Sequence, residues 1–332
     1  MKLIFKIAVI LLIISSFYTV AESKDVQLSL SIEEGIYNSS EQMPALLSRL
    51  RTKLRYSKTV DSHHFKLQSR FDPVFFNDDQ IYKLYNEIQL SRRGSAFSWL
   101  GRFYHRYFTY DLAGQRNTSI NISGIGIDFF LPRNKNSGYV LSADYYYHKL
   151  NFRPVSQTDG LKASAGINWI LGKAAEFRAD MSAERYIISA ESFDNVPGRN
   201  RGWRFAPKLS FRYSSMVMFD CSLSAAVRRP EHTGRLIKEY SLQAVGGTYL
   251  GRKTSVLVFV NFHHSESKIK DIPIYLLYTP VDFESRIDFK MSYDVLKSSE
   301  IYLRTGYGRD ELPGGILTVS GAEIIAGFKV RF

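Results

Sequence analysis

The feature that most constrains the fold of this chain is an alternation of apolar and polar residues that recurs along almost its whole length. In residues 175–184 the odd positions are apolar, whereas the even positions include Glu176, Arg178 and Asp180. Because side chains of a β-strand point alternately to its two faces, each such segment predicts a strand with one apolar and one polar face. Many segments run to about ten residues or more, the length of a tilted membrane strand, whereas strands of soluble sandwiches usually have about five or six.

Sixteen segments follow this pattern. They cover residues 26–32, 46–56, 65–71, 82–90, 97–107, 118–131, 139–152, 161–169, 175–183, 203–213, 217–227, 240–244, 256–262, 283–293, 301–307 and 322–332. The alternation is less regular in 118–131 and 139–152, where we expect changes of phase around Gly124 and among residues 145–147. Short connections such as 172–173 alternate with longer ones such as 189–201, as do the turns and outer loops of membrane barrels.

The N-terminus has the pattern of a secretory signal peptide. Lys2 and Lys6 precede an apolar run over residues 7–14, and small or polar residues follow up to Ala21. We expect cleavage after Ala21 or Ser23. Cleavage after Ala21 removes two lysines and lowers the net charge from +12 to +10. No later stretch approaches the about 20 apolar residues of a spanning helix, so a mature chain in a membrane must cross it with strands.

The C-terminus supports the same interpretation. In residues 322–332 the even positions are apolar and the odd positions are mostly polar or small, with Ile325 as the exception. Gly327, Phe328, Val330 and Phe332 resemble the last strand of bacterial outer-membrane β-barrels, which the barrel-insertion machinery recognises. Ile325 stands where that family usually has a polar residue.

The resemblance and the alternation together predict an all-β protein. Residues 1–21 form the signal peptide and residues 25–332 form a transmembrane antiparallel β-barrel of about sixteen strands, with 14 or 18 as alternatives. In lipid every backbone polar group must be paired, so the sheet must close on itself. The apolar rows then face hydrocarbon and the charged rows face the lumen, because a charge on the lipid face at mid-bilayer costs about 2–4 kcal/mol. Sixteen strands enclose a lumen too wide for side chains alone to fill.

The charges predicted to face the lumen are unevenly distributed. A basic wall comprises Arg49, Arg51, Lys53, Arg55, Lys66, Arg70, Arg102 and Arg106. A mixed or acidic wall comprises Glu176, Asp180, Glu184, Asp282, Glu284 and Asp288. Opposed walls of this kind produce a transverse field that orients solutes in a pore. The alternative is that these charges pair across neighbouring strands and only stiffen the lumen.

Enzymatic interpretations have little support. His263 and Ser265 resemble the triad segment of outer-membrane lipid A deacylases, but those barrels are far smaller and His263 has the lumen parity. We expect no enzyme, no catalytic residue and no cofactor. Cys221 is the only cysteine, so neither an intrachain disulfide nor a cysteine metal cluster can form. The basic balance does not indicate nucleic acid binding, because an exported protein rarely meets nucleic acid and the charges alternate with apolar residues.

The sequence therefore predicts a porin-like channel for small hydrophilic or anionic solutes. Two alternatives remain open: a secretion or assembly barrel that exports polysaccharide or surface protein, and a structural or lipid-modifying barrel. The expected location is the cell outer membrane after signal-peptide cleavage. Its expected partners are outer-membrane lipid and lipopolysaccharide, the barrel-assembly machinery and small anionic solutes. The long connection 264–281 contains the apolar run 271–278, which we expect to cap the outer mouth. The alternatives are an inward fold that forms a constriction and a short hairpin outside the membrane.

Overall fold

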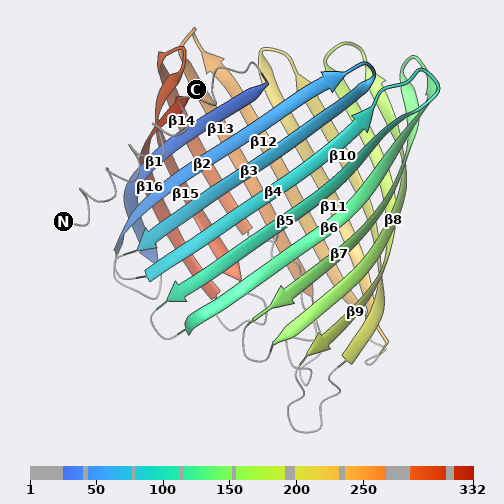
Figure 1. Ribbon diagram of the computed structural model, residues 1–332, viewed down its shortest axis with the longest axis horizontal. Helices are drawn as coiled ribbons and strands as arrows, with labels where there is room; N and C mark the ends of the chain where they lie inside the picture. Colours follow the sequence, from blue (N-terminus) through green and yellow to red (C-terminus); the bar gives the residue numbers. More distant parts are fainter. Residues whose placement is uncertain are drawn as a thin grey trace.

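The computed structural model describes residues 25–39, 44–76, 79–112, 115–151, 155–190, 199–231, 236–266, 285–311 and 318–332. These residues form one antiparallel sheet of sixteen strands that closes into a barrel, as Figure 1 shows. The predicted fold class and strand number are confirmed. Among the described residues, no helix is long and apolar enough to cross a membrane. The predicted signal peptide and most of connection 264–281 lie outside the described residues.

The sixteen strands follow one another around the barrel in chain order. They are β1 (Val26–Ser39), β2 (Ala45–Val60), β3 (His63–Phe76), β4 (Asp79–Arg92), β5 (Ser98–Leu112), β6 (Gln115–Asn134), β7 (Ser137–Leu150), β8 (Ser156–Leu171), β9 (Ala175–Ala190), β10 (Arg199–Ser214), β11 (Val217–Pro230), β12 (Ile237–Leu250), β13 (Thr254–Glu266), β14 (Ser285–Leu296), β15 (Ser299–Glu311) and β16 (Thr318–Arg331). They contain 12 to 20 residues each, more than the about 9–11 that a tilted strand needs to cross a bilayer.

The barrel closes where β1 pairs with β16, from Ser29 opposite Arg331 to Ser39 opposite Gly321. Beyond the last strand, the Phe332 amide donates to the Leu28 carbonyl at 2.8 Å. The start of β1 and the end of β16 lie at the same rim as the tight turns (Figure 1); we call it the turn rim and the opposite end the loop rim. Two of these turns contain Gly172 and Gly251 at φ of 72° and 79°, which glycine adopts without a steric penalty.

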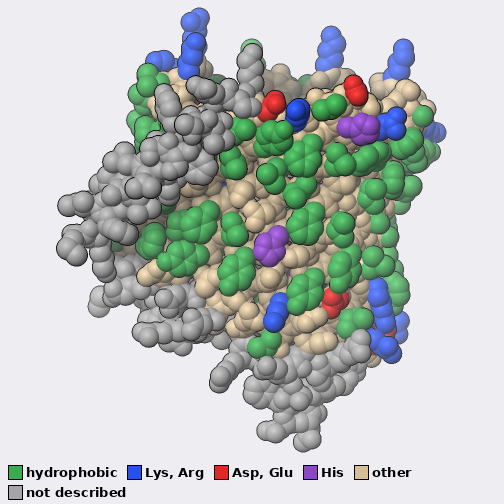
Figure 2. Space-filling view, in the orientation of Figure 1, with side chains coloured by type: hydrophobic (Ala, Val, Ile, Leu, Met, Phe, Trp, Pro, Cys, Tyr) green, Lys and Arg blue, Asp and Glu red, His purple; other side chains and the backbone are tan. Residues whose placement is uncertain are grey.

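Side-chain exposure confirms which parity faces outward. On β16, Ile324 is 60% and Phe328 44% exposed on the outer surface, whereas Glu323 faces the lumen and is 6% exposed. Hydrophobic side chains cover much of the outer face seen in Figure 2. The buried residues of the described barrel include many carboxylates, amides and hydroxyls, as expected when the interior of the barrel is its polar side.

Two irregularities of the sequence pattern have a physical explanation. The expected change of phase around Gly124 is wrong: β6 keeps its register past this residue, and the pattern is noisy because the buried Ile120 and Ile122 share the lumen parity. Likewise, Ile325 is fully buried and packs with Leu47 and Val74 in a small apolar cluster. An apolar residue on the lumen side is stable when it packs against another, even though the surrounding surface is polar.

Candidate functional site: the charged lumen

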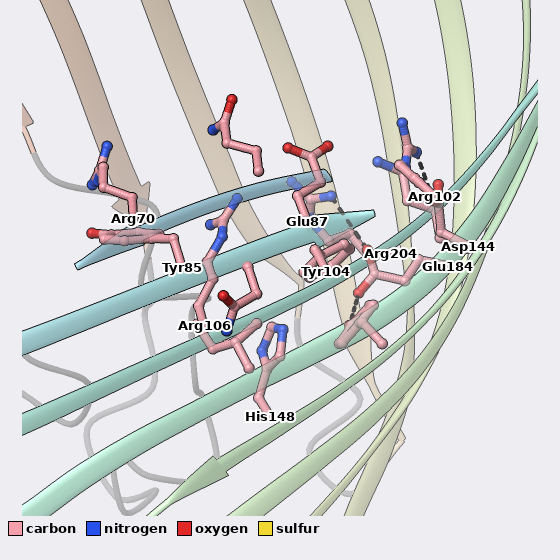
Figure 3. Close-up of a pocket in the computed structure, with 15 residues that line it drawn as sticks. Arg70, Tyr85, Glu87, Arg102, Tyr104, Arg106, Asp144, His148, Glu184 and Arg204 are labelled. Carbon is pink, nitrogen blue, oxygen red and sulfur yellow. Dashed lines mark hydrogen bonds and ion pairs between the residues drawn. The ribbon is translucent and has the colours of Figure 1, made fainter. Parts of the chain in front are cut away.

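Two cavities lined mostly by polar and charged residues, with volumes of about 690 and 490 Å³, lie against the inner wall. The larger cavity is bordered by residues of β3 to β10 and the smaller one by residues of β5 to β12. Arg102, Asp144 and Lys162 border both, so the two spaces meet at these side chains. Figure 3 shows side chains from neighbouring strands converging on the larger cavity.

The two cavities differ in charge. The larger is lined by Arg70, Arg102, Arg106, Lys162 and Arg204 against Glu87, Asp144 and Glu184, so cations exceed carboxylates by five to three. The smaller is lined by Arg102, Lys162, Arg178, Lys208 and Arg212 against Asp128, Asp144, Glu176, Asp180 and Asp220, which balance at five each. Cation excess is therefore a property of the larger cavity.

Tyrosine rings give the larger cavity an amphipathic surface. The Arg70 guanidinium lies 3.8 Å from the centroid of the Tyr85 ring, and that of Arg106 lies 5.6 Å from the centroid of Tyr104. Such stacking holds a guanidinium in place while leaving donors on its edge available to a ligand. Tyr146 lines the same cavity and donates a hydrogen bond to Glu184.

All eight residues of the predicted basic wall lie on the lumen parity of β2, β3 and β5, but half of them are tied to carboxylates. Arg49 pairs with Glu33 at 3.2 Å. Arg51 and Arg70 share Asp72 at 3.2 and 3.1 Å, and Arg102 bridges Asp144 and Asp128 at 2.6 and 3.0 Å. The alternative of internal pairing therefore describes these four arginines.

The remaining basic-wall residues of β2 and β3 form what we call the cationic patch: Lys53, Arg55 and Lys66. None of the three forms an ion pair with another described residue; Arg55 contacts the side-chain oxygen of Gln68 at 3.5 Å. Lys53 lies within electrostatic range of Arg55, Arg70, Lys66 and Lys329. Like charges held this close favour an anion between them.

The predicted acidic and mixed wall is largely neutralised by arginines. Asp180 pairs with Arg178 at 2.8 Å, Glu184 with Arg204 at 3.5 Å, and Glu176 with Arg212 at 3.8 Å. Asp288 pairs with Arg286. Asp282 and Glu284 lie outside the described residues.

Glu33, a carboxylate that no sequence motif singles out, organises the closing seam. Its side chain is 1% exposed and lies 3.2, 3.8 and 3.5 Å from the guanidinium groups of Arg49, Arg51 and Arg304. It also accepts a hydrogen bond of 2.6 Å from Tyr302. Glu33 thus connects β15 to β2 across the junction of β16 and β1. The only sequence signal for Glu33 is that it falls on the polar side of the alternating pattern of β1.

Histidines occur on both sides of the wall. His263 has the lumen parity, whereas His264 is exposed on the outer face. A second histidine–serine pair is formed across strands: His105 Nδ1 lies 3.0 Å from Ser123 Oγ on the outer surface, beside the exposed Phe103 and Ile125. Hydrolysis requires water, and a mid-strand site among apolar side chains offers little. Among the described residues, no group of three potential ligands could hold a metal ion.

Comparison with known proteins identifies the fold. No family model matches the chain, and no curated protein matches it. Among solved structures, CdiB from Acinetobacter baumannii aligns over 93% of this chain and 60% of its own, with 8% identity and a TM-score of 0.54. This chain has the fold of an outer-membrane β-barrel. It spans about 60% of the length of CdiB, and at this identity the likeness extends to the fold alone.

Two further matches are weaker. OmpT of Vibrio cholerae aligns over 94% of this chain and 99% of its own, with 11% identity and a TM-score of 0.46. A bacterial polysaccharide outer membrane secretin aligns over 92% and 98%, with 10% identity and a TM-score of 0.43.

Proposed function

We propose that this protein resides in the bacterial outer membrane and lets small hydrophilic solutes, anions in particular, diffuse passively through its lumen. The observation that carries the proposal is the larger cavity, in which five cations face three carboxylates. A lumen with an excess of one sign of charge concentrates counter-ions and raises their rate of entry. The apolar outer surface of Figure 2 is what a location in lipid requires.

The cationic patch extends this preference beyond the cavity. Lys53, Arg55 and Lys66 are half-exposed on the inner face of β2 and β3, next to Gln68, which borders the larger cavity. Their field reaches about 8 Å at physiological salt. An anion near the patch therefore meets a second group of cations at the cavity, whereas a cation is repelled by both.

Conductance and reversal potentials in planar bilayers test the proposal. The wild-type pore is expected to conduct and to prefer chloride under a salt gradient. The triple variant Lys53→Gln, Arg55→Gln, Lys66→Gln is expected to lower that preference, because no described carboxylate neutralises these three charges. The matched control is the triple variant Lys135→Gln, Lys173→Gln, Lys297→Gln, which removes three lysines from turns at the turn rim.

The control should retain the anion preference, because its charges lie outside the lumen and are screened by salt. Absence of conductance in the wild type, or equal reversal potentials for the wild type and the patch variant, would refute the proposal. If the reversal potential of the control variant shifts as much as that of the patch variant, selectivity depends on net charge and not on charges in the lumen.

A further inference from the structure

A row of polar residues crosses the outer, apolar surface of the barrel between β3 and β6. Ser69 faces Asn86, Asn86 faces His105, and His105 faces Ser123 in the register of these four strands. The parity is outward, because the flanking Phe71, Ile88, Phe103 and Ile125 are all exposed. Figure 2, which views this wall, shows a histidine among hydrophobic side chains at mid-height.

The row satisfies only part of its own hydrogen-bonding capacity. Ser69 donates to the Asn86 side-chain oxygen at 2.8 Å, and His105 Nδ1 bonds Ser123 Oγ at 3.0 Å. The Asn86 amide NH₂ and the second ring nitrogen of His105 form no hydrogen bond with any described residue. Hydrocarbon offers them no partner, and an unsatisfied polar group there is unfavourable.

The opposite wall lacks such a row at comparable positions. There, Leu223 faces Leu242 and Leu242 faces Phe262 in the register of β11 to β13. Val258 likewise faces Phe289 across β13 and β14. These side chains suit lipid, so the polar row distinguishes one wall of the barrel from the other.

We propose that the wall formed by β3 to β6 docks a second copy of this chain in the membrane, about a two-fold axis near Asn86 and His105. Polar side chains on membrane-facing surfaces are favourable when they bond across to another protein. In a two-fold interface the same patch occurs on both sides, so it must be self-complementary. The side chains of Asn86 and His105 each have one group bonded within the row, and each retains a second polar group to offer to its counterpart.

The position of the polar row restricts which kind of partner can bind this wall. It lies at mid-strand: Ser69 and Asn86 are seventh and eighth in strands of 14 residues. Lipid headgroups and soluble proteins do not reach this depth, so the partner must itself be embedded in the membrane. The row contains no Asp, Glu, Lys or Arg that would call for a partner of opposite charge. Aromatic neighbours such as Phe71, Phe103 and Tyr107 are the residues that interface cores favour.

Site-specific cross-linking in intact outer membranes tests the interface. In a Cys221→Ser background, which removes the only native cysteine, single cysteines replace Ile88 or Phe103, which face each other beside the row. Val258→Cys and Phe289→Cys, also a facing pair, are the matched controls on the opposite wall. With a short bismaleimide, the row positions should yield roughly tenfold more homodimer than the controls, a ratio equivalent to about 1.4 kcal/mol.

A second variant tests the role of the polar groups themselves. Adding Asn86→Leu and His105→Leu to Ile88→Cys should reduce the homodimer several-fold, while Leu223→Val and Leu242→Val should not. Heat-dependent gel mobility confirms that each variant is folded. The proposal fails if row and control positions cross-link equally or not at all, if the product contains a different protein, or if the folded leucine variant cross-links like its parent.

Discussion

Gly327→Ala should destabilise the barrel through a clash with one tyrosine ring. Gly327 of β16 lies in register between Tyr302 of β15 and Glu33 of β1. The Tyr302 ring passes over the glycine so that its hydroxyl reaches Glu33 at 2.6 Å. A Cβ at position 327 would lie 2.3 Å from Tyr302 Cζ. The ring would have to move away and lose its hydrogen bond to the buried carboxylate.

The expected cost combines two effects. Overpacking at a closely packed site costs about 1–3 kcal/mol, and losing a hydrogen bond to a charged group costs about 1.5–3 kcal/mol. Since moving the ring relieves part of the clash, we expect about 2–4 kcal/mol in total. Gly308→Ala is the matched control: it lies on the lumen side of β15, and its Cβ would meet only ordinary contacts from 3.5 Å outward.

Urea unfolding of the purified proteins in lipid vesicles, followed by gel mobility and tryptophan fluorescence, measures these costs. A double-mutant cycle separates the clash from a backbone effect, because Tyr302→Ala removes the ring that the new methyl group strikes. In that background Gly327→Ala should cost little. Equal destabilisation by Gly327→Ala and Gly308→Ala, or an undiminished cost of Gly327→Ala in the Tyr302→Ala background, would refute the reasoning.

Three further outcomes follow from the same geometry. Glu33→Gln should lower the free energy of unfolding by about 3–5 kcal/mol, because it removes one partner of a buried ion pair, and urea unfolding checks this. Deleting Phe332 should impair assembly, because its backbone pairs with Leu28 at the seam; the amount of heat-modifiable barrel in outer-membrane fractions measures the defect. At the loop rim, the Glu231 carboxylate accepts hydrogen bonds from Arg185 and Arg201. The bond from Arg185 contributes most to holding the pKa of this carboxyl group below its usual value, and the bond from Arg201 contributes less. Stability from this contact should be present above the unfolded-state pKa and lost as the pH falls through the lower folded-state pKa, so Glu231→Gln should flatten the acid dependence of thermal unfolding slightly.

The sequence predicts the strands because a membrane-embedded sheet leaves each residue only two environments. On β16, alternation alone separates exposed Ile324 and Phe328 from buried Glu323. The same reasoning fails at Ile120, Ile122 and Ile325, where apolar side chains face the lumen. A polar lumen tolerates an apolar residue that packs on a neighbour, so alternation is stricter on the lipid side than on the lumen side.

The basic wall shows what alternation leaves undetermined. Parity assigns Arg51, Arg70 and Lys53 to the lumen equally, yet Arg51 and Arg70 share Asp72 and Lys53 has no carboxylate partner among the described residues. Which arginine meets which carboxylate depends on the register of adjacent strands, and on side chains that reach diagonally across them. The cationic patch could therefore be recognised only after the pairing was known.

The closing seam depends on contacts even more remote in sequence. Tyr302 and Glu33 are 269 residues apart, and closure of the sheet alone makes them neighbours. A similar arrangement recurs in β7 to β9, where the Tyr146 ring crosses Gly160 and its hydroxyl reaches Glu184. There a Cβ on the glycine would lie 2.1 Å from the ring. Tyr146, Gly160 and Glu184 lie on three successive strands far from the chain ends. A tyrosine ring that crosses a glycine is therefore a general way to reach over the neighbouring strand and is not restricted to the seam. At the seam it ties β15 directly to β1, so that opening the barrel there requires breaking a buried charge network as well as the backbone ladder.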